Sequence, residues 1–167
     1  MSKPKGPKHI IPNPASQLQN AGGGASKYKF GEASDSLRSL LNSKPVFAFD
    51  FLSLNGNEKC FNSQLVTTRD YNRLMQTLKE LSHKTFKEID DNRRYYHFHE
   101  VGFDDTTLRL SEFLSCLVAD PSKVDADSAP TLYQIKAFEE ARLLGFFYRN
   151  VFYLVYFDRQ HNTYKRK

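Results

Sequence analysis

The chain ends in VFYLVYFDRQHNTYKRK, where an apolar stretch is followed directly by side chains suited to acid–base and phosphate chemistry. The imidazole of His161 titrates near neutral pH, so it suits either a general base or a general acid. Tyr164 can take the same roles if neighbouring cations lower its pKa. Arg142, near the start of the preceding apolar stretch, offers a two-pronged guanidinium that fits a phosphate.

These three groups together could cleave RNA without a metal ion. Such cleavage needs a base for the 2′-hydroxyl proton, an acid for the leaving 5′-oxygen and a cation for the phosphate. We therefore predict that Arg142, His161 and Tyr164 converge on one positively charged patch, with Arg142 and His161 on the rim of the fold. The candidate RNA contacts around this patch are Lys136, Arg159, Lys165 and Arg166.

Each candidate also has a simpler structural interpretation. His161 lies near the chain end, where surface histidines are often idle. Arg142 could form an ion pair with Glu139 or Glu140, and Tyr164 could pack on the edge of a sheet. The final cations could be a solvated tail.

His97 and His99 form an H-x-H pattern, which in a strand would point both rings to one face. A zinc site is one interpretation, but no third ligand is evident, since Glu100 would face the other way and neither cysteine is near in sequence. We favour a structural or RNA-contacting role, and we predict neither a metal site nor a cofactor.

Three strands are predicted at the C-terminal end, at 131–138, 141–148 and 151–158. Two-residue connections at 139–140 and 149–150 suit antiparallel hairpins. The last strand is apolar on both faces, which predicts an interior place in the sheet.

Two helices in tandem are predicted over residues 67–91, with a break near Ser82. Thr67 and Asp70 fit a capping box at the start of the first helix. A short helix precedes them, because Leu37, Leu40 and Leu41 follow helical spacing before Pro45.

The remaining segments are a strand over 46–54, a strand over 93–103 and a helix over 104–120. The fold class is therefore α+β, an antiparallel sheet of four or more strands with the helix pair on one face. Residues 32–167 would form this single domain.

Residues 1–31 contain five lysines and no acidic residue, and they are rich in Pro, Gly and Ser. This composition predicts a disordered basic arm. No apolar run approaches the roughly 18 residues of a membrane-spanning helix, and no apolar segment follows the basic start as in a secretory signal. Two cysteines, Cys60 and Cys116, suit a reducing cytoplasm.

The order of these elements resembles the RelE/ParE superfamily of small bacterial toxins, most clearly over residues 131–164. Gln134 and Lys136 stand where that family has a basic strand, Arg142 where it has an early arginine, and His161 and Tyr164 where it has a basic residue and a tyrosine. The chain departs from the family by an insertion at about 95–130 and by lacking the usual C-terminal helix.

The resemblance implies a cytoplasmic, metal-independent endoribonuclease that cleaves mRNA, free or on the ribosome, and is held by a protein antitoxin in a toxin–antitoxin or phage-defence system. A second possibility is a non-catalytic member that grips a protein or a nucleic acid, as ParE-like members grip gyrase. A third is an interaction module that uses residues 95–130 as its contact surface.

Overall fold

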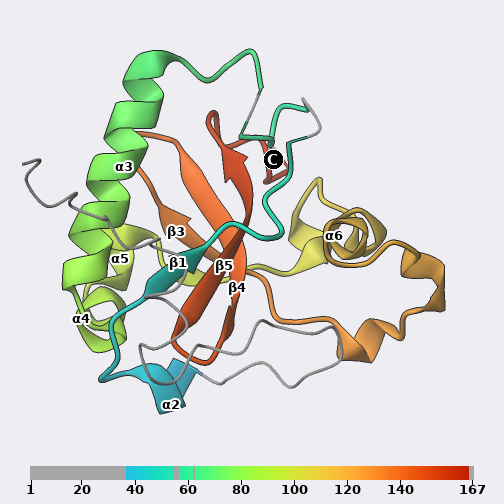
Figure 1. Ribbon diagram of the computed structural model, residues 1–167, viewed down its shortest axis with the longest axis horizontal. Coiled ribbons are helices and arrows are strands. Elements are labelled where there is room, and N and C mark those ends of the chain that lie inside the picture. The colour runs from blue at the N-terminus through green and yellow to red at the C-terminus, as the bar shows by residue number, and fades with distance from the viewer. Residues whose placement is uncertain (1–36, 55–56, 62, 166–167) are drawn as a thin grey trace, which may run out of the picture.

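The computed structural model describes residues 37–54, 57–61 and 63–165. The arm predicted at residues 1–31 and the candidate RNA contact Arg166 lie outside these described residues. The described chain is α+β, with one mixed five-stranded sheet between a group of helices on one face and a second helical segment on the other (Figure 1). None of its helices is long and apolar enough to cross a membrane.

The sheet has the strand order β1-β5-β4-β3-β2. Its strands are β1 (Val46–Ala48), β2 (His99–Glu100), β3 (Tyr133–Lys136), β4 (Arg142–Tyr148) and β5 (Val151–Asp158). The last three strands form the predicted antiparallel meander. Every residue of β5 is buried, and β5 lies inside the sheet between β1 and β4, as its two apolar faces predicted.

The prediction of a wholly antiparallel sheet is wrong at one edge, because β1 runs parallel to β5. The backbone N–H of Val46 donates to the carbonyl of Asn150, so β1 starts beside the turn that starts β5. Residues 49–150, which include most of the helices and the other three strands of the sheet, connect β1 to β5. A connection of that length permits a parallel pair, whereas a hairpin does not.

A β-bulge between β4 and β5 determines on which face of the sheet the last side chains of β5 lie. Leu144 pairs with Tyr156 and Gly145 with Leu154, so Val155 is an extra residue. A Cβ on Gly145 would lie 2.1 Å from the carbonyl oxygen of Tyr153, so the close approach requires glycine. Because side chains alternate along a strand, the extra residue moves Asp158 to the opposite face of the sheet.

The first face of the sheet carries α3 (Thr68–His83), α4 (Phe86–Asp91) and α5 (Arg93–Tyr96). Thr67 and Asp70 form the predicted capping box of α3, and Thr85 and Glu88 form an equivalent one on α4. The break between the two helices falls at Lys84, close to the predicted position. The apolar stripes of α3 and α4 are buried against the sheet, and this packing holds the two helices on that face.

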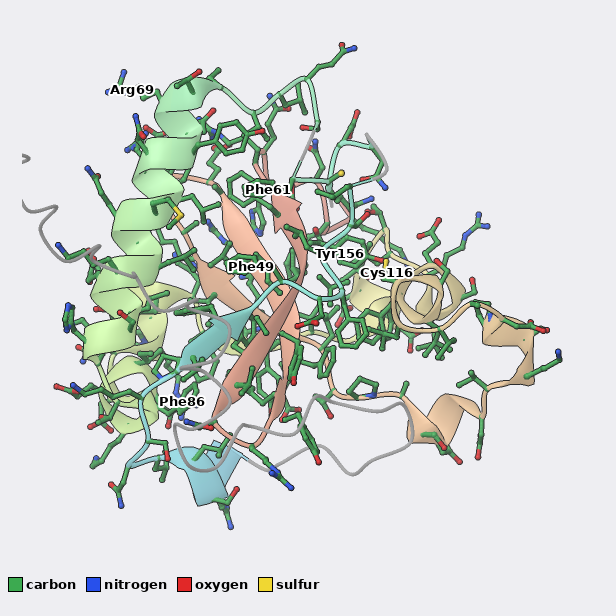
Figure 2. All side chains as sticks on the ribbon, viewed as in Figure 1. Phe49, Phe61, Arg69, Phe86, Cys116 and Tyr156 are labelled. Carbon is green, nitrogen blue, oxygen red and sulfur yellow. The ribbon has the colours of Figure 1, made fainter. Side chains whose placement is uncertain are left out.

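Helix α6 (Leu110–Leu117) covers part of the opposite face, followed by single 3₁₀ turns at Pro121–Lys123 and Ala126–Ser128. A further 3₁₀ turn lies at Phe103–Asp105, and a short helix α2 occupies Leu37–Leu40. Aromatic rings fill both layers: Phe86 lies on the α4 side and Tyr156 beside Cys116 on the α6 side (Figure 2).

Three element boundaries differ from the prediction. The strand expected over 46–54 is paired only at Val46–Ala48. The segment expected as a strand over 93–103 begins with the helix α5, and only two of its residues pair in the sheet. The helix expected over 104–120 starts at Leu110, because residues 105–107 instead bond to the C-terminal segment.

Candidate functional site

The first residue of β4, Arg142, carries a guanidinium enclosed by the sheet rather than exposed on its rim. Its exposed fraction is 5%, which corrects the expectation of a rim position. One terminal nitrogen donates to the carbonyl oxygens of Glu139 at 3.2 Å and Ala141 at 3.1 Å. Nε has no partner within the described chain. Burial lowers the pKa of Arg142, but arginine stays protonated in proteins.

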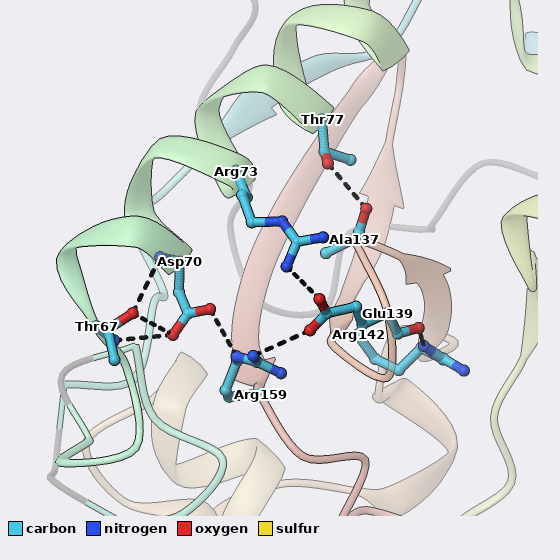
Figure 3. Close-up of polar contacts among 8 residues, drawn as sticks. All are labelled: Thr67, Asp70, Arg73, Thr77, Ala137, Glu139, Arg142 and Arg159. Atoms are coloured by element: carbon cyan, nitrogen blue, oxygen red, sulfur yellow. Dashed lines mark hydrogen bonds and ion pairs between the residues drawn. The ribbon is translucent and has the colours of Figure 1, made fainter.

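The ion pair considered for Arg142 does not form in the described part of the molecule. The carboxylate of Glu139 is instead held by Arg73 and Arg159 (Figure 3). The Arg142 guanidinium points away from this cluster. A buried arginine that bonds only backbone carbonyls keeps donors free for an anion.

The segment after β5 is fixed by a buried carboxylate. Asp158 is fully buried and accepts hydrogen bonds from the backbone N–H of Asn162 at 2.9 Å and of Thr163 at 2.7 Å, and from the Thr163 hydroxyl at 2.5 Å. Thr107 ties the same segment from outside, with its N–H on the Thr163 carbonyl at 2.7 Å. Residues 159–165 are therefore a built part of the fold and not a loose tail.

This turn holds His161 in a left-handed backbone conformation, with φ of 57°. Left-handed backbone is costly for a residue with a side chain, and such positions are often found at functional sites. The ring of His161 lies edge-on to the ring of Tyr164, with 5.1 Å between the ring centroids. Tyr164 is itself paired with Thr106 by an isolated β-bridge, which holds its backbone against residue 106.

The protonation states of this pair follow from burial and from the nearby arginine. Burial, and then the positive charge of Arg142, lowers the pKa of His161, so its imidazole is neutral at pH 7. Burial raises the pKa of Tyr164 above its usual value, although Arg142 acts in the opposite direction. Tyr164 is therefore a neutral hydroxyl at pH 7 and suits a hydrogen-bond or proton donor. The idea that cations lower its pKa enough to make it a base is not supported.

Two further histidines and a glutamine adjoin these residues. The ring centroids of His99 and Tyr164 are 6.3 Å apart. The Gln134 side-chain amide donates to His99 Nε2 at 3.3 Å and to the His97 carbonyl at 3.4 Å. His99 Nδ1 bonds the Glu100 carbonyl at 2.7 Å, so both ring nitrogens of His99 have partners in one neutral tautomer.

His97 ends α5 with a left-handed φ of 44°. Burial lowers the pKa of its imidazole, and the charges of Arg142 and Lys136 lower it further. The H-x-H pattern was the signal for these histidines. The prediction that both rings share one strand face is wrong, because His97 ends the helix α5 and only His99 lies in a strand.

Four unpartnered polar atoms mark this cluster. Within the described chain, five buried side-chain nitrogen or oxygen atoms lack a hydrogen-bond partner. Four of them are Gln134 Oε1, Arg142 Nε, His161 Nε2 and Tyr164 OH. Buried polar atoms in native proteins are nearly always satisfied, so a concentration of exceptions indicates a place for a polar ligand. We call Arg142, His161, Tyr164, Gln134, His97 and His99 the histidine–arginine cluster.

The predicted RNA contacts are distributed differently. Lys136 is the cross-strand partner of Arg142, and its ammonium lies 5.8 Å from the centre of the Tyr95 ring. Lys165 donates to the carbonyl of Asp104 at 2.6 Å beside the cluster. Arg159 joins another group, where it pairs with Asp70 at 2.9 Å (Figure 3).

The described residues contain no group of three or more His, Cys, Asp or Glu side chains placed to hold a metal ion. The chemistry that the cluster offers is thus a neutral imidazole, a neutral phenol and a fixed guanidinium. That set can move a proton and stabilise negative charge at one place.

Comparison with known proteins gives one family match. The model of the family described as Uncharacterised protein UU032 matches residues 47–167, which include the whole cluster. No curated protein and no solved structure matches the chain.

Proposed function

The chain belongs to the family described as Uncharacterised protein UU032, and we propose that it is a ribonuclease that cleaves RNA through the 2′-hydroxyl. One observation carries this proposal: Arg142 Nε, His161 Nε2 and Tyr164 OH are buried, unpartnered and gathered in one cluster. A phosphodiester with its adjacent ribose offers complementary oxygens to all three.

In the proposed reaction, neutral His161 accepts the proton of the 2′-hydroxyl through Nε2. The 2′-oxygen attacks phosphorus, and the bond from phosphorus to the 5′-oxygen breaks. The products are a 2′,3′-cyclic phosphate and a 5′-hydroxyl. Low pKa values favour the unprotonated imidazole that a base requires, and burial of His161 supplies that condition.

Arg142 would stabilise the negative charge that grows on the phosphate oxygens. Its guanidinium is preorganised by two backbone carbonyls, so little reorganisation accompanies the reaction. Tyr164 would donate its hydroxyl proton to the departing 5′-oxygen, which leaves as the 5′-hydroxyl. Gln134 and His99 would act as positioning residues, because their hydrogen bond fixes the ring beside Tyr164.

The resemblance to RelE/ParE toxins extends this proposal to mRNA in the cytoplasm, with or without the ribosome, and to control by a protein antitoxin. The direct test of the enzyme is incubation of the purified chain with an unstructured RNA oligonucleotide in the presence of EDTA. We expect cleavage, and we expect His161→Ala to slow it by about 10²–10⁴-fold, the usual worth of a general acid or base. Cleavage that proceeds unchanged in His161→Ala would contradict the proposed role.

A non-catalytic nucleic-acid-binding protein is the second candidate. The cationic and aromatic side chains around the cluster fit RNA binding as well as they fit cleavage. Binding alone, however, gives no role to the unpartnered His161 Nε2. Saturable RNA binding with no cleavage of free or ribosome-bound RNA would favour this second candidate.

A further inference from the structure

A groove of about 330 Å³ opens between α3, α5 and the end of β3, outside the histidine–arginine cluster. The lining side chains that matter below are Arg73, Glu80, Tyr95, Tyr96, Lys136 and Phe138. We call it the Tyr95 groove. It combines aromatic rings with cationic side chains, the combination that binds single-stranded nucleic acid.

Tyr95 is the unusual side chain of this groove. Its exposed fraction is 66%, whereas its neighbour Tyr96 is 8% exposed. The two rings meet edge-to-face with 4.9 Å between centroids, and the Tyr96 hydroxyl donates to Glu80 at 3.0 Å. A buried, hydrogen-bonded ring therefore supports an exposed one. A supported aromatic face is a stacking platform that loses little entropy when a ligand binds.

Of the two cationic side chains in the groove, Arg73 forms an ion pair and Lys136 is available to a ligand. Arg73 is engaged by Glu139 and lies over the Phe138 ring, 4.7 Å from its centre. Lys136 has no carboxylate within ion-pair distance among the described residues, and its ammonium lies near the Tyr95 ring. A phosphate can therefore approach Lys136 without displacing an internal ion pair.

Glu80 and Lys136 give the groove a negative side and a positive side. Its carboxylate accepts from Tyr96 and would repel a phosphate, but carboxylates also accept from the amino groups of base edges. The base of a bound nucleotide is thus favoured on the Glu80 side and its phosphate on the Lys136 side.

Lys136 connects the groove to the histidine–arginine cluster. It is the cross-strand partner of Arg142, and its charge lowers the pKa of His97. His97 also lies only two residues after Tyr95, at the end of the same short helix. A chain of nucleotides could therefore pass from the cluster to the groove across Lys136.

We infer that the Tyr95 groove binds the base of a nucleotide in single-stranded RNA, next to the phosphate that the cluster cleaves, by stacking on Tyr95 with a backbone phosphate on Lys136. This inference rests on the proposed function for the identity of the strand. The stacking itself does not depend on cleavage, so the two can be tested separately.

The test uses the full chain and a 2′-O-methyl RNA oligonucleotide carrying 2-aminopurine, because this probe has no 2′-hydroxyl to attack and its fluorescence falls on stacking. Tyr95→Ala should weaken binding about tenfold and remove the quenching, since stacking on one aromatic ring has about that worth. Tyr95→Phe should keep both. Lys136→Gln should weaken binding and lower the salt dependence, by about 0.7 in the logarithmic slope for one phosphate contact.

Met75→Ala is the control, because Met75 is an exposed side chain of α3, a helix that borders the groove, and does not itself line the groove. Unchanged affinity and quenching in Tyr95→Ala would overturn the inference. If the wild-type chain binds the probe with quenching but cleaves no RNA, the inference about the groove stands and the proposed enzyme is refuted. If the wild-type chain cleaves RNA but Tyr95→Ala binds the probe unaltered, the proposed enzyme stands and the inference about the groove is refuted.

Discussion

Asp158 and Arg142 are directly opposed on neighbouring strands, yet the carboxylate of Asp158 bonds the following turn and not the guanidinium. Both side chains are buried, and the negative charge still raises the pKa of Arg142 against the effect of burial. Asp158 thus orders the segment that carries His161 and compensates the buried charge of Arg142, and Nε of Arg142 stays without a partner in the described chain.

Asp158→Asn is expected to weaken both effects. The amide cannot accept from Asn162 and Thr163 with both of its ends, and it removes the charge beside Arg142. We expect a loss of about 2–3 kcal/mol in the free energy of unfolding, the worth of hydrogen bonds to a buried charge. Urea denaturation measures this loss. Asp91→Asn, which removes only an exposed ion pair with Lys87, is the control and should cost under about 1 kcal/mol. Equal effects in the two variants would contradict the assigned role of Asp158.

Tyr164→Phe should separate function from stability. The Tyr164 hydroxyl has no partner in the described chain, so its removal is expected to leave the free energy of unfolding unchanged or slightly raised. RNA cleavage should fall, because the proposed donor is lost. Tyr96→Phe is the opposite control: its hydroxyl bonds Glu80, so we expect a loss of about 1–2 kcal/mol and little change in the cleavage step. A marked destabilisation by Tyr164→Phe would identify Tyr164 as a structural residue.

The strands and helices of this fold were predictable where a local pattern decided them. The apolar stripe of 67–91, the capping box at Thr67 and the two hairpins all follow from residues near one another in sequence. The parallel pairing of β1 was not predictable, because it depends on a contact with Asn150, distant in the chain. The strand predicted over 93–103 from its strand propensity failed at its start, because residues 93–96 form the short helix α5.

The candidate site was predictable in its residue types but not in its environment. Alternation along β5 would place Asp158 on the other face, and only the bulge beside Gly145 brings it to Arg142. The contribution of His97 and His99 required the left-handed end of α5, which the H-x-H spacing does not reveal.

Stability should fall as the pH is lowered from 7 to 5. His161 and His97 have folded-state pKa values below their usual 6.5, so the unfolded chain binds protons first as the pH falls through that value. Proton uptake by the unfolded state lowers the free energy of unfolding, and the full stability is present only above the unfolded pKa. His161→Gln should reduce this slope in urea denaturation, and His83→Gln, at an exposed position of α3, should not. A slope that both variants leave intact would contradict the burial of a neutral His161.

Arg142→Lys should reduce cleavage although it retains a positive charge. Lysine has a single nitrogen, so it cannot bond the Glu139 and Ala141 carbonyls as Nη1 does and also place a donor where Nε lies. We expect the maximal rate to fall by about 10²-fold, with a smaller change in KM, because the donor acts on charge that develops during the reaction. Arg159→Lys is the matched control: it perturbs the pairs with Asp70 and Glu139 and should affect stability more than rate. An unchanged rate in Arg142→Lys would remove Arg142 from the reaction.

The most direct test of the central claim uses an oligonucleotide that is 2′-O-methylated at every ribose except one. The wild-type chain, in EDTA, should cleave it only after the free 2′-hydroxyl and leave a 2′,3′-cyclic phosphate, identified by mass spectrometry. His161→Ala should yield at most about one hundredth of this product in the same time. Cleavage at methylated positions, or a 3′-hydroxyl product, would contradict attack by the 2′-oxygen, and an oligonucleotide that the wild-type chain leaves intact both free and in the presence of ribosomes would contradict the enzyme.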